Sequence, residues 1–168
     1  MTQPVSIAAG SIGFFFCNHY MQGIHGGIQS LHAAVELGLN FPPGTPGFEV
    51  LQVWGRSGEP TAILLNAGFQ SRLENVARSV EAFNREANDG IVLPYARFRE
   101  GMDEMNGTLT AVALVVPGQW VTREFSASPQ EVEEALALGD PTEVAGRMTQ
   151  WSMGDRLRLL RHGMPLRS

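Results

Sequence analysis

Apolar residues occur along the chain in two patterns, one typical of strands and one typical of helices. Nearly continuous apolar runs predict buried strands at residues 12–17, 61–66, 91–98 and 109–116. A further run at residues 49–54 predicts a short strand. Apolar residues at intervals of three and four predict a helix over residues 70–87, with a buried stripe of Leu73, Val76, Val80, Phe83 and Ala87.

A glycine-rich turn and a second helical pattern follow the first strand. The turn can bend sharply because residues without a Cβ accept positive φ angles, and its glycines are Gly23, Gly26 and Gly27. Apolar residues then recur at helical spacing, and three of them are expected to face the core: Ile28, Leu31 and Val35. The polar residues of this helix share another face: His25, Gln29, His32 and Glu36.

This polar face begins directly after a strand, where a helix presents free backbone N–H groups and the positive end of its dipole. Anionic ligands bind readily at such positions, so the turn and the polar face form the first candidate site. Two other interpretations stay open. The face is a solvated helix edge, or His25, His32 and Glu36 contribute to a metal site.

The order of elements is strand, helix, one or two strands, helix, strand, loop and strand. This order predicts an α/β fold in which a three-layer mixed β-sheet carries helices on both faces, formed by residues 1–117. Pro94 has no backbone N–H, so the strand at 91–98 should lie at a sheet edge or begin near that residue.

Residues 118–168 predict a helical C-terminal extension packed on the sheet domain. Ser128, Pro129 and Glu131 form a good helix start, and helices are expected near 129–138, 141–151 and 154–162. The apolar residues available for packing on the sheet or on a second subunit are Val132, Leu136, Leu138, Val144, Met148 and Trp151.

The composition is that of a globular protein. Of its 168 residues, 43% are hydrophobic and 17% are charged, and no apolar run reaches the roughly 20 residues that a membrane crossing requires. The first residues lack a basic segment followed by an apolar one, which predicts no secretion signal and a cytoplasmic location. The net charge of −5 argues against a dominant nucleic-acid surface. All 12 basic residues are arginine, so the chain contains no lysine.

Cys17 is the only cysteine, which excludes an internal disulfide and fits a reducing compartment. If the first strand continues to His19, the thiol and the imidazole lie on the same side of the sheet. A thiol-dependent site is therefore one interpretation, and a small buried hydrophobe is the other.

Three segments between residues 13 and 117 carry a resemblance to a known family. The first has Met21, a glycine-rich turn, and then Gln29, His32, Ala33 and Ala34. The second has Trp54, Ser57 and Gly58 before an apolar strand, and the third has Gly107, Thr108 and Thr110 before a strand closed by Pro117. In this order they resemble the peptidyl-tRNA hydrolase family found mainly in archaea and eukaryotes, the second of two unrelated folds with that activity.

The resemblance implies hydrolysis of the ester between a peptide and the 3′ end of tRNA, without a metal or cofactor. His25 occupies the place of the family's lysine, as a phosphate contact or general acid/base. Glu100 stands where the family has an aspartate, and Glu100 or Asp103 would orient the water. Thr108 and Thr110 would bind near the scissile carbonyl.

The substrate-binding residues implied by the resemblance are Gly23, Gly26, Gly27, Gln29 and His32. Ligands of open sheets gather at the carboxyl ends of strands, so one cleft is expected to collect His25, His32, Glu100, Thr108 and Thr110. The expected partner is tRNA or another anionic ligand and not a membrane. The edge near Pro94 and the apolar extension are compatible with a homodimer.

Two alternatives come from other functional classes. The first is a catalytically inactive family member that binds protein, nucleotide or RNA, since a fold does not fix function. The second is a metal- or thiol-dependent hydrolase that uses Cys17 or His32. A positive surface around residues 23–27 would favour a tRNA enzyme, and a neutral or negative one would favour a protein-binding module.

Overall fold

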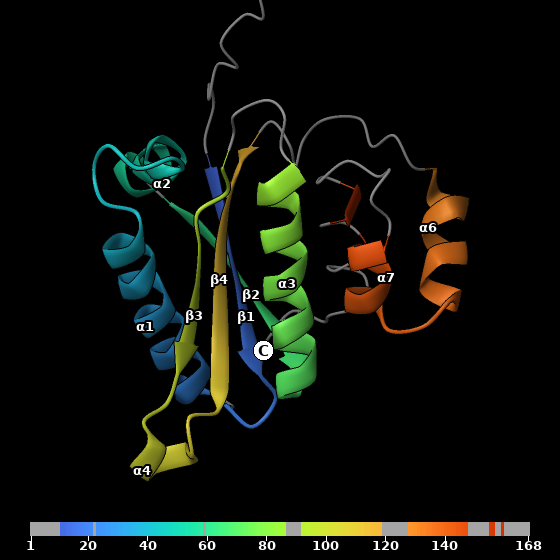
Figure 1. The fold of residues 1–168 in the computed structure, drawn as a ribbon, viewed down its shortest axis with the longest axis horizontal. Coiled ribbons are helices and arrows are strands. Elements are labelled where there is room, and N and C mark those ends of the chain that lie inside the picture. The colour runs from blue at the N-terminus through green and yellow to red at the C-terminus, as the bar shows by residue number, and fades with distance from the viewer. Residues whose placement is uncertain are drawn as a thin grey trace, which may run out of the picture.

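The computed structural model describes residues 11–21, 23–58, 60–86, 92–118, 128–147, 155, 156 and 159. A four-stranded sheet with the order β2-β1-β4-β3 lies between helical layers (Figure 1). The strands are β1 (Ser11–Asn18), β2 (Thr61–Gly68), β3 (Tyr95–Arg99) and β4 (Leu109–Pro117). The predicted α/β class, with a mixed sheet and helices on both faces, is confirmed.

The sheet is mixed because β1 pairs parallel with β2 and antiparallel with β4, which in turn pairs antiparallel with β3. β1 and β4 are central and almost wholly buried, as their apolar runs predict. Pro94 directly precedes β3, which is an edge strand. This placement confirms the prediction made from the missing N–H.

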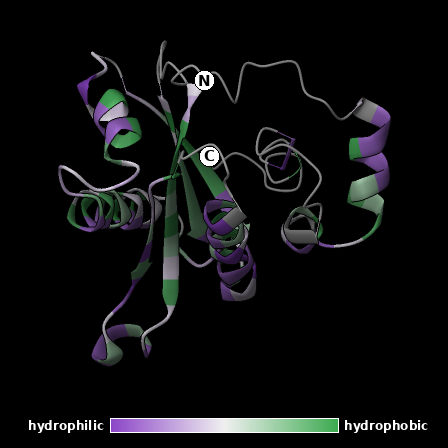
Figure 2. Ribbon diagram, turned by 45° about the horizontal axis from the view of Figure 1, so that its top comes forward, coloured by the Kyte–Doolittle hydropathy of each residue, from purple (hydrophilic) through white to green (hydrophobic). Residues whose placement is uncertain are grey.

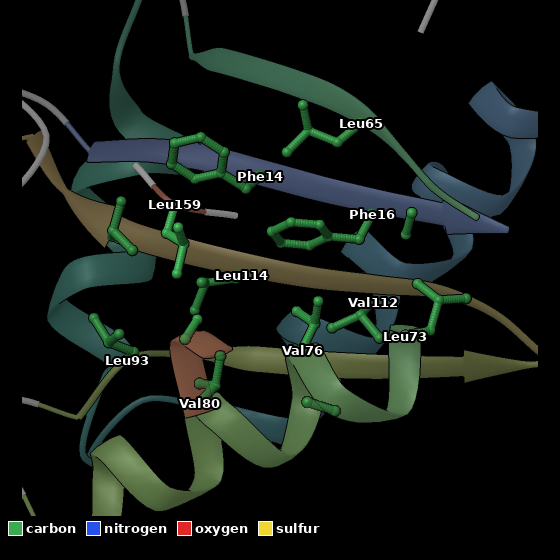
Figure 3. Close-up of a cluster of buried hydrophobic side chains, with 14 of the residues drawn as sticks. Phe14, Phe16, Leu65, Leu73, Val76, Val80, Leu93, Val112, Leu114 and Leu159 are labelled. Carbon is green, nitrogen blue, oxygen red and sulfur yellow. The ribbon is translucent and has the colours of Figure 1, made fainter. Parts of the chain in front are cut away.

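The two faces of the sheet carry different packing. Side chains alternate across a strand, so Phe14 and Phe16 point to one face and Phe15 and Cys17 to the other. On the first face, the large side chains of β1 and β4 meet helix α3 (Gln70–Glu86). Figure 3 shows this packing for Phe16 of β1, Leu114 of β4, and Leu73 and Val76 of α3. Of the predicted apolar stripe of α3, Leu73, Val76 and Val80 are buried there and Phe83 is partly buried, while Ala87 lies outside the described residues.

The opposite face is covered by α1 (Ile24–Asn40) and α2 (Phe48–Arg56). The prediction of a strand at residues 49–54 is wrong, because these residues belong to α2. Val50, Leu51 and Trp54 lie at helical intervals and pack on the same core cluster, so the apolar run forms one side of a helix. Trp54 also donates its indole N–H to the carbonyl of Thr61 at 2.9 Å.

The prediction of which face of α1 packs on the core is also wrong. Ile28, Leu31 and Val35 are 41%, 65% and 55% exposed, whereas Ala33 and Leu37 are fully buried. The sheet face under α1 is lined by small residues, among them Ala111 and Ala113. Small residues of the helix therefore pack closely on that face, and the bulky ones point outward.

The described part of the C-terminal extension shares the core of the sheet domain. It contains α6 (Pro129–Ala137), which begins with a capping box between Ser128 and Glu131, and α7 (Pro141–Arg147), which packs on α3. Val132 and Val144 are buried with the sheet residues, but Leu138 is 64% exposed, contrary to expectation. Met148, Trp151 and most of residues 154–162 lie outside the described residues.

Figure 2 shows hydrophobic residues concentrated along the strands, while the helices carry both hydrophobic and hydrophilic residues. Among the described helices, none combines the length and the apolar character that crossing a membrane requires.

Candidate functional site

Three strands end at the same edge of the sheet. Because β3 is antiparallel to β4, and β4 to β1, the strands β1, β2 and β3 all point the same way. The turn after β1, the loop after β2 and the short helix α4 (Met102–Met105) therefore lie at one end, the lower end in Figure 1. Ligands of open sheets gather at such an edge.

A buried polar cluster joins α1, β3 and β4 at this edge. Gln29 is only 6% exposed, and its Nε2 donates to Glu100 Oε1 at 2.5 Å. Its Oε1 accepts a hydrogen bond from Thr110 Oγ1 at 2.8 Å. With both ends of the amide engaged, the side chain holds Glu100 in one orientation.

Glu100 is the acid that this cluster positions. Its backbone N–H donates to the carbonyl of Thr108 at 3.0 Å, and one carboxylate oxygen is taken by Gln29. The other oxygen has no protein partner among the described residues. Asp103 is exposed on α4, and the hydrogen bonds of the Gln29 side chain go to Glu100 and Thr110. Of the two predicted acids, Glu100 is therefore the one with a fixed position and an available oxygen.

The two predicted threonines both have structural partners. Thr110 is fully buried, so its hydroxyl acts on Gln29 and has no access to a bound ligand. The Thr108 hydroxyl donates to the carbonyl of Met105 at 2.5 Å and closes the α4 turn. Thr110 is thus a positioning residue for the amide that holds Glu100.

The two histidines lie on the same flank of α1 as Gln29. His25 is exposed about one turn before it and has no hydrogen-bonding or charged partner among the described residues. His32 is also exposed, about one turn after Gln29, and its ring stacks on Phe98 with centroids 4.6 Å apart and planes 9° apart. Direct contacts thus unite Gln29, Glu100 and Thr110, with the two imidazoles on either side.

The glycine turn opens the N-terminus of α1. Gly23 has a φ of 56°, a conformation that favours glycine, and no side chain caps the first turn of the helix. Gly26 is buried and its carbonyl accepts from the Ser30 hydroxyl at 2.8 Å. Gly27 is exposed, with no atom near the position that a Cβ would take. The N–H of Gly26 donates to the carbonyl of Gly23 at 3.2 Å, so the first-turn N–H groups available to a ligand are those of Ile24 and His25.

An exposed aromatic cluster at the same edge was not predicted from the sequence. The rings of His19, Tyr20 and Phe69 contact one another with centroids 5.7–6.3 Å apart. Tyr20 is 69% exposed and Phe69 56%. His19 Nδ1 lies 3.1 Å from Asn66 Nδ2, and the backbone N–H of His19 donates to Gly68. The signal was present as aromatic residues directly after two parallel strands.

Charges at this edge are mostly negative or paired. The guanidinium of Arg72 bonds to Asp140, and that of Arg99 bonds to Glu74. The carboxylates of Glu100, Asp103 and Glu104 lie along the β3–β4 connection. The guanidinium groups of Arg72 and Arg99 are therefore both paired, and neither is free to bind the phosphates of a long nucleic acid.

The thiol and metal interpretations find no support in the described residues. Cys17 is fully buried, with its sulfur 3.2 Å from Ser30 Oγ, whereas His19 follows the end of β1 and pairs with Asn66. Within the described ranges, no group of three or more His, Cys, Asp or Glu side chains is arranged to hold a metal ion.

No protein-family model and no curated protein matches this chain. A functional assignment therefore rests on the geometry of the Gln29–Glu100 cluster and its surroundings, and on the resemblance of its motifs.

Proposed function

We propose that the chain hydrolyses the ester that joins a peptide to the 3′ end of tRNA. The observation that carries the proposal is the hydrogen bond from Gln29 to Glu100, which fixes a carboxylate against the second turn of α1, a helix whose N-terminus has no side-chain cap. A fixed carboxylate with one available oxygen is suited to general-base catalysis. The open helix N-terminus is suited to negative charge.

In the proposed reaction, Glu100 takes a proton from a water molecule, and the oxygen of that water attacks the carbon of the ester carbonyl. The negative charge that develops on the carbonyl oxygen is stabilised by the first-turn N–H groups of Ile24 and His25. The C–O bond to the ribose then breaks, and the ribose oxygen receives a proton from His25 or from water. The products are a peptide with a free carboxylate and a tRNA with a free 3′ hydroxyl.

The aromatic cluster of His19, Tyr20 and Phe69 supports a nucleic-acid end as the leaving group. Aromatic rings stack on bases with little regard to sequence. Because the guanidinium groups of Arg72 and Arg99 are paired, binding should depend on the terminal nucleotides more than on the body of the tRNA.

The test compares two esters of the same N-acetyl amino acid, one on full tRNA and one on adenosine alone. We expect the chain to cleave the tRNA ester, and to cleave the adenosine ester with a higher KM and a similar kcat. Failure to cleave either ester under any buffer condition would exclude this activity.

A catalytically inactive binding module is the second candidate function. The negative and paired charges at the edge favour it, since they suit a protein partner better than a polyanion. This candidate function predicts that the folded protein neither cleaves nor binds either ester.

A further inference from the structure

The outward face of α1 is a continuous apolar stripe. Its residues recur every three or four positions and are 41–76% exposed: Ile24, Ile28, Leu31, Val35 and Leu39. The helix forms the outer layer on its side of the sheet, and no described element covers this face (Figure 1). The stripe presents on the order of 500 Å² of apolar surface, near the upper limit for a single patch on a monomer.

Two glycines lie beside the stripe without a reason within the chain. Gly27 and Gly38 fall on one flank of the exposed face, and no atom lies within 4 Å of the position that a Cβ would take at either one. Glycine destabilises a helix relative to alanine. A close neighbour on this flank would explain both, since glycine, which has no side chain, lets a second backbone approach most closely.

We propose that a second copy of this chain covers the stripe, with the two α1 helices antiparallel across a two-fold axis near Leu31. In this arrangement Ile24 lies opposite Leu39 of the partner subunit, and Ile28 lies opposite Val35 of the partner subunit. The stripe is therefore self-complementary, as an isologous interface requires. Two stripes together bury about 1,000 Å², the lower limit for a specific interface.

The flanks of the helix also match under this symmetry. Such an axis brings the same flank of both helices together. On one side Gly27 then meets Gly38 of the partner subunit, which permits close approach. On the other side His25 meets Glu36 of the partner subunit, an imidazole beside a carboxylate.

The charge of α1 favours a second copy over another partner. Glu36 is the only acidic residue in the helix, which contains no arginine. Self-association therefore brings few charges together at the centre of the interface, and the single acid has a histidine opposite it. His25 belongs to the candidate site, so in the dimer Glu36 of the partner subunit lies beside that site.

The first test is sedimentation equilibrium of the full chain. The wild type is expected to be a dimer, and Leu31→Asp a folded monomer. Leu138→Asp is the matched control, since Leu138 is 64% exposed on another part of the surface. A wild type that is monomeric at all concentrations overturns the proposal, whatever else covers the stripe, and so does a dimer that survives Leu31→Asp.

The second test fixes the direction of the helices by disulfide formation between engineered cysteines. Leu31→Cys should crosslink to itself, whereas Ile24→Cys should crosslink to Leu39→Cys and not to itself. Cys17 is fully buried and does not compete. Self-crosslinking of Ile24→Cys would indicate parallel helices and overturn the proposed symmetry.

A third variant separates folding from association. Gly38→Leu should raise the thermal midpoint of the monomer, because it replaces a helix glycine in open space. It should weaken the dimer at least tenfold, because the flank can no longer approach its partner. Unchanged association of this variant would contradict the role of the glycine flank.

Discussion

Gln29 Nε2 lies 2.5 Å from Glu100 Oε1, and this hydrogen bond joins α1 to the end of β3 across 71 positions of sequence. The other end of the same amide is bound by Thr110, which is fully buried. The position of the acid therefore depends on a chain of two hydrogen bonds that reaches into the core.

Removing the buried hydroxyl should affect the activity although it does not touch substrate. Thr110→Val keeps the shape of the side chain, but frees the Gln29 amide to rotate. We expect a loss of about 1 kcal/mol in unfolding free energy and a roughly tenfold fall in kcat. In a double-mutant cycle, Thr110→Val should cost little more once Gln29→Met is present. Equal costs in both backgrounds would contradict the proposed chain of contacts.

The role of His25 should appear when its imidazole is replaced. His25→Lys keeps a side chain that can contact phosphate or transfer a proton, so it should retain cleavage, whereas His25→Ala should lower kcat roughly 10²-fold or more. The rates are compared on the same N-acetyl-aminoacyl-tRNA. A lysine variant as slow as the alanine variant would contradict the role of His25 as a phosphate contact or general acid.

The aromatic cluster should affect substrate binding and not chemistry. Tyr20→Ala and Phe69→Ala each remove an exposed ring that can stack on a base. Loss of one stacked base costs about 1–3 kcal/mol, so KM for the tRNA ester should rise roughly tenfold or more, with kcat unchanged. Leu138→Ala provides an exposed apolar control away from this edge. Equal KM values in all variants would exclude stacking.

Asp140 should make the stability of the chain depend on acid pH. Burial alone would raise the pKa of this carboxyl, but hydrogen bonds from Thr142 and Arg72 outweigh burial and hold the pKa below its ordinary value. Because the folded-state pKa is lowered, the stabilisation is present at neutral pH and is lost as pH falls through that value.

The corresponding variant is Asp140→Asn. It should reduce the free energy of unfolding by about 1 kcal/mol at pH 7, since it removes the negative charge that accepts from Arg72. Asparagine still caps the start of α7, so the loss reports on the charge alone. The difference from the wild type should shrink between about pH 5 and pH 2. Urea denaturation measures it, with the exposed Glu133→Gln as the control. A difference that is constant over this range would show that the charge contributes nothing.

The sequence predicted the strands and α3 because each has a single dominant pattern. In β4 every side chain is buried, and in α3 one stripe is apolar, so pattern and environment agree. The helix α1 has two patterns, one of bulky apolar residues and one of small and polar residues. The small residues pack inward because the sheet beneath is lined by alanines. The residue pattern of the helix alone does not show which sheet residues it will pack against.

The candidate site was predicted in part for a related reason. Spacing along α1 placed Gln29 and the two histidines on one flank, and the resemblance singled out Glu100 and Thr110. The partners of Gln29 lie 71 and 81 positions away, so spacing alone could not show that they contact it. Nor could it show that Phe69 meets Tyr20, because that contact depends on β1 and β2 being neighbours.

The most direct measurement is the single-turnover rate of N-acetyl-aminoacyl-tRNA cleavage by the wild type, Glu100→Gln and Glu104→Gln. Glutamine keeps the size of Glu100 but cannot take a proton from water, so its rate should fall roughly 10²–10⁴-fold. Glu104 is exposed on α4, in the same connection between β3 and β4, and its variant should cleave at the wild-type rate. A Glu100→Gln variant that is folded and as fast as the wild type would contradict the proposed role of this carboxylate.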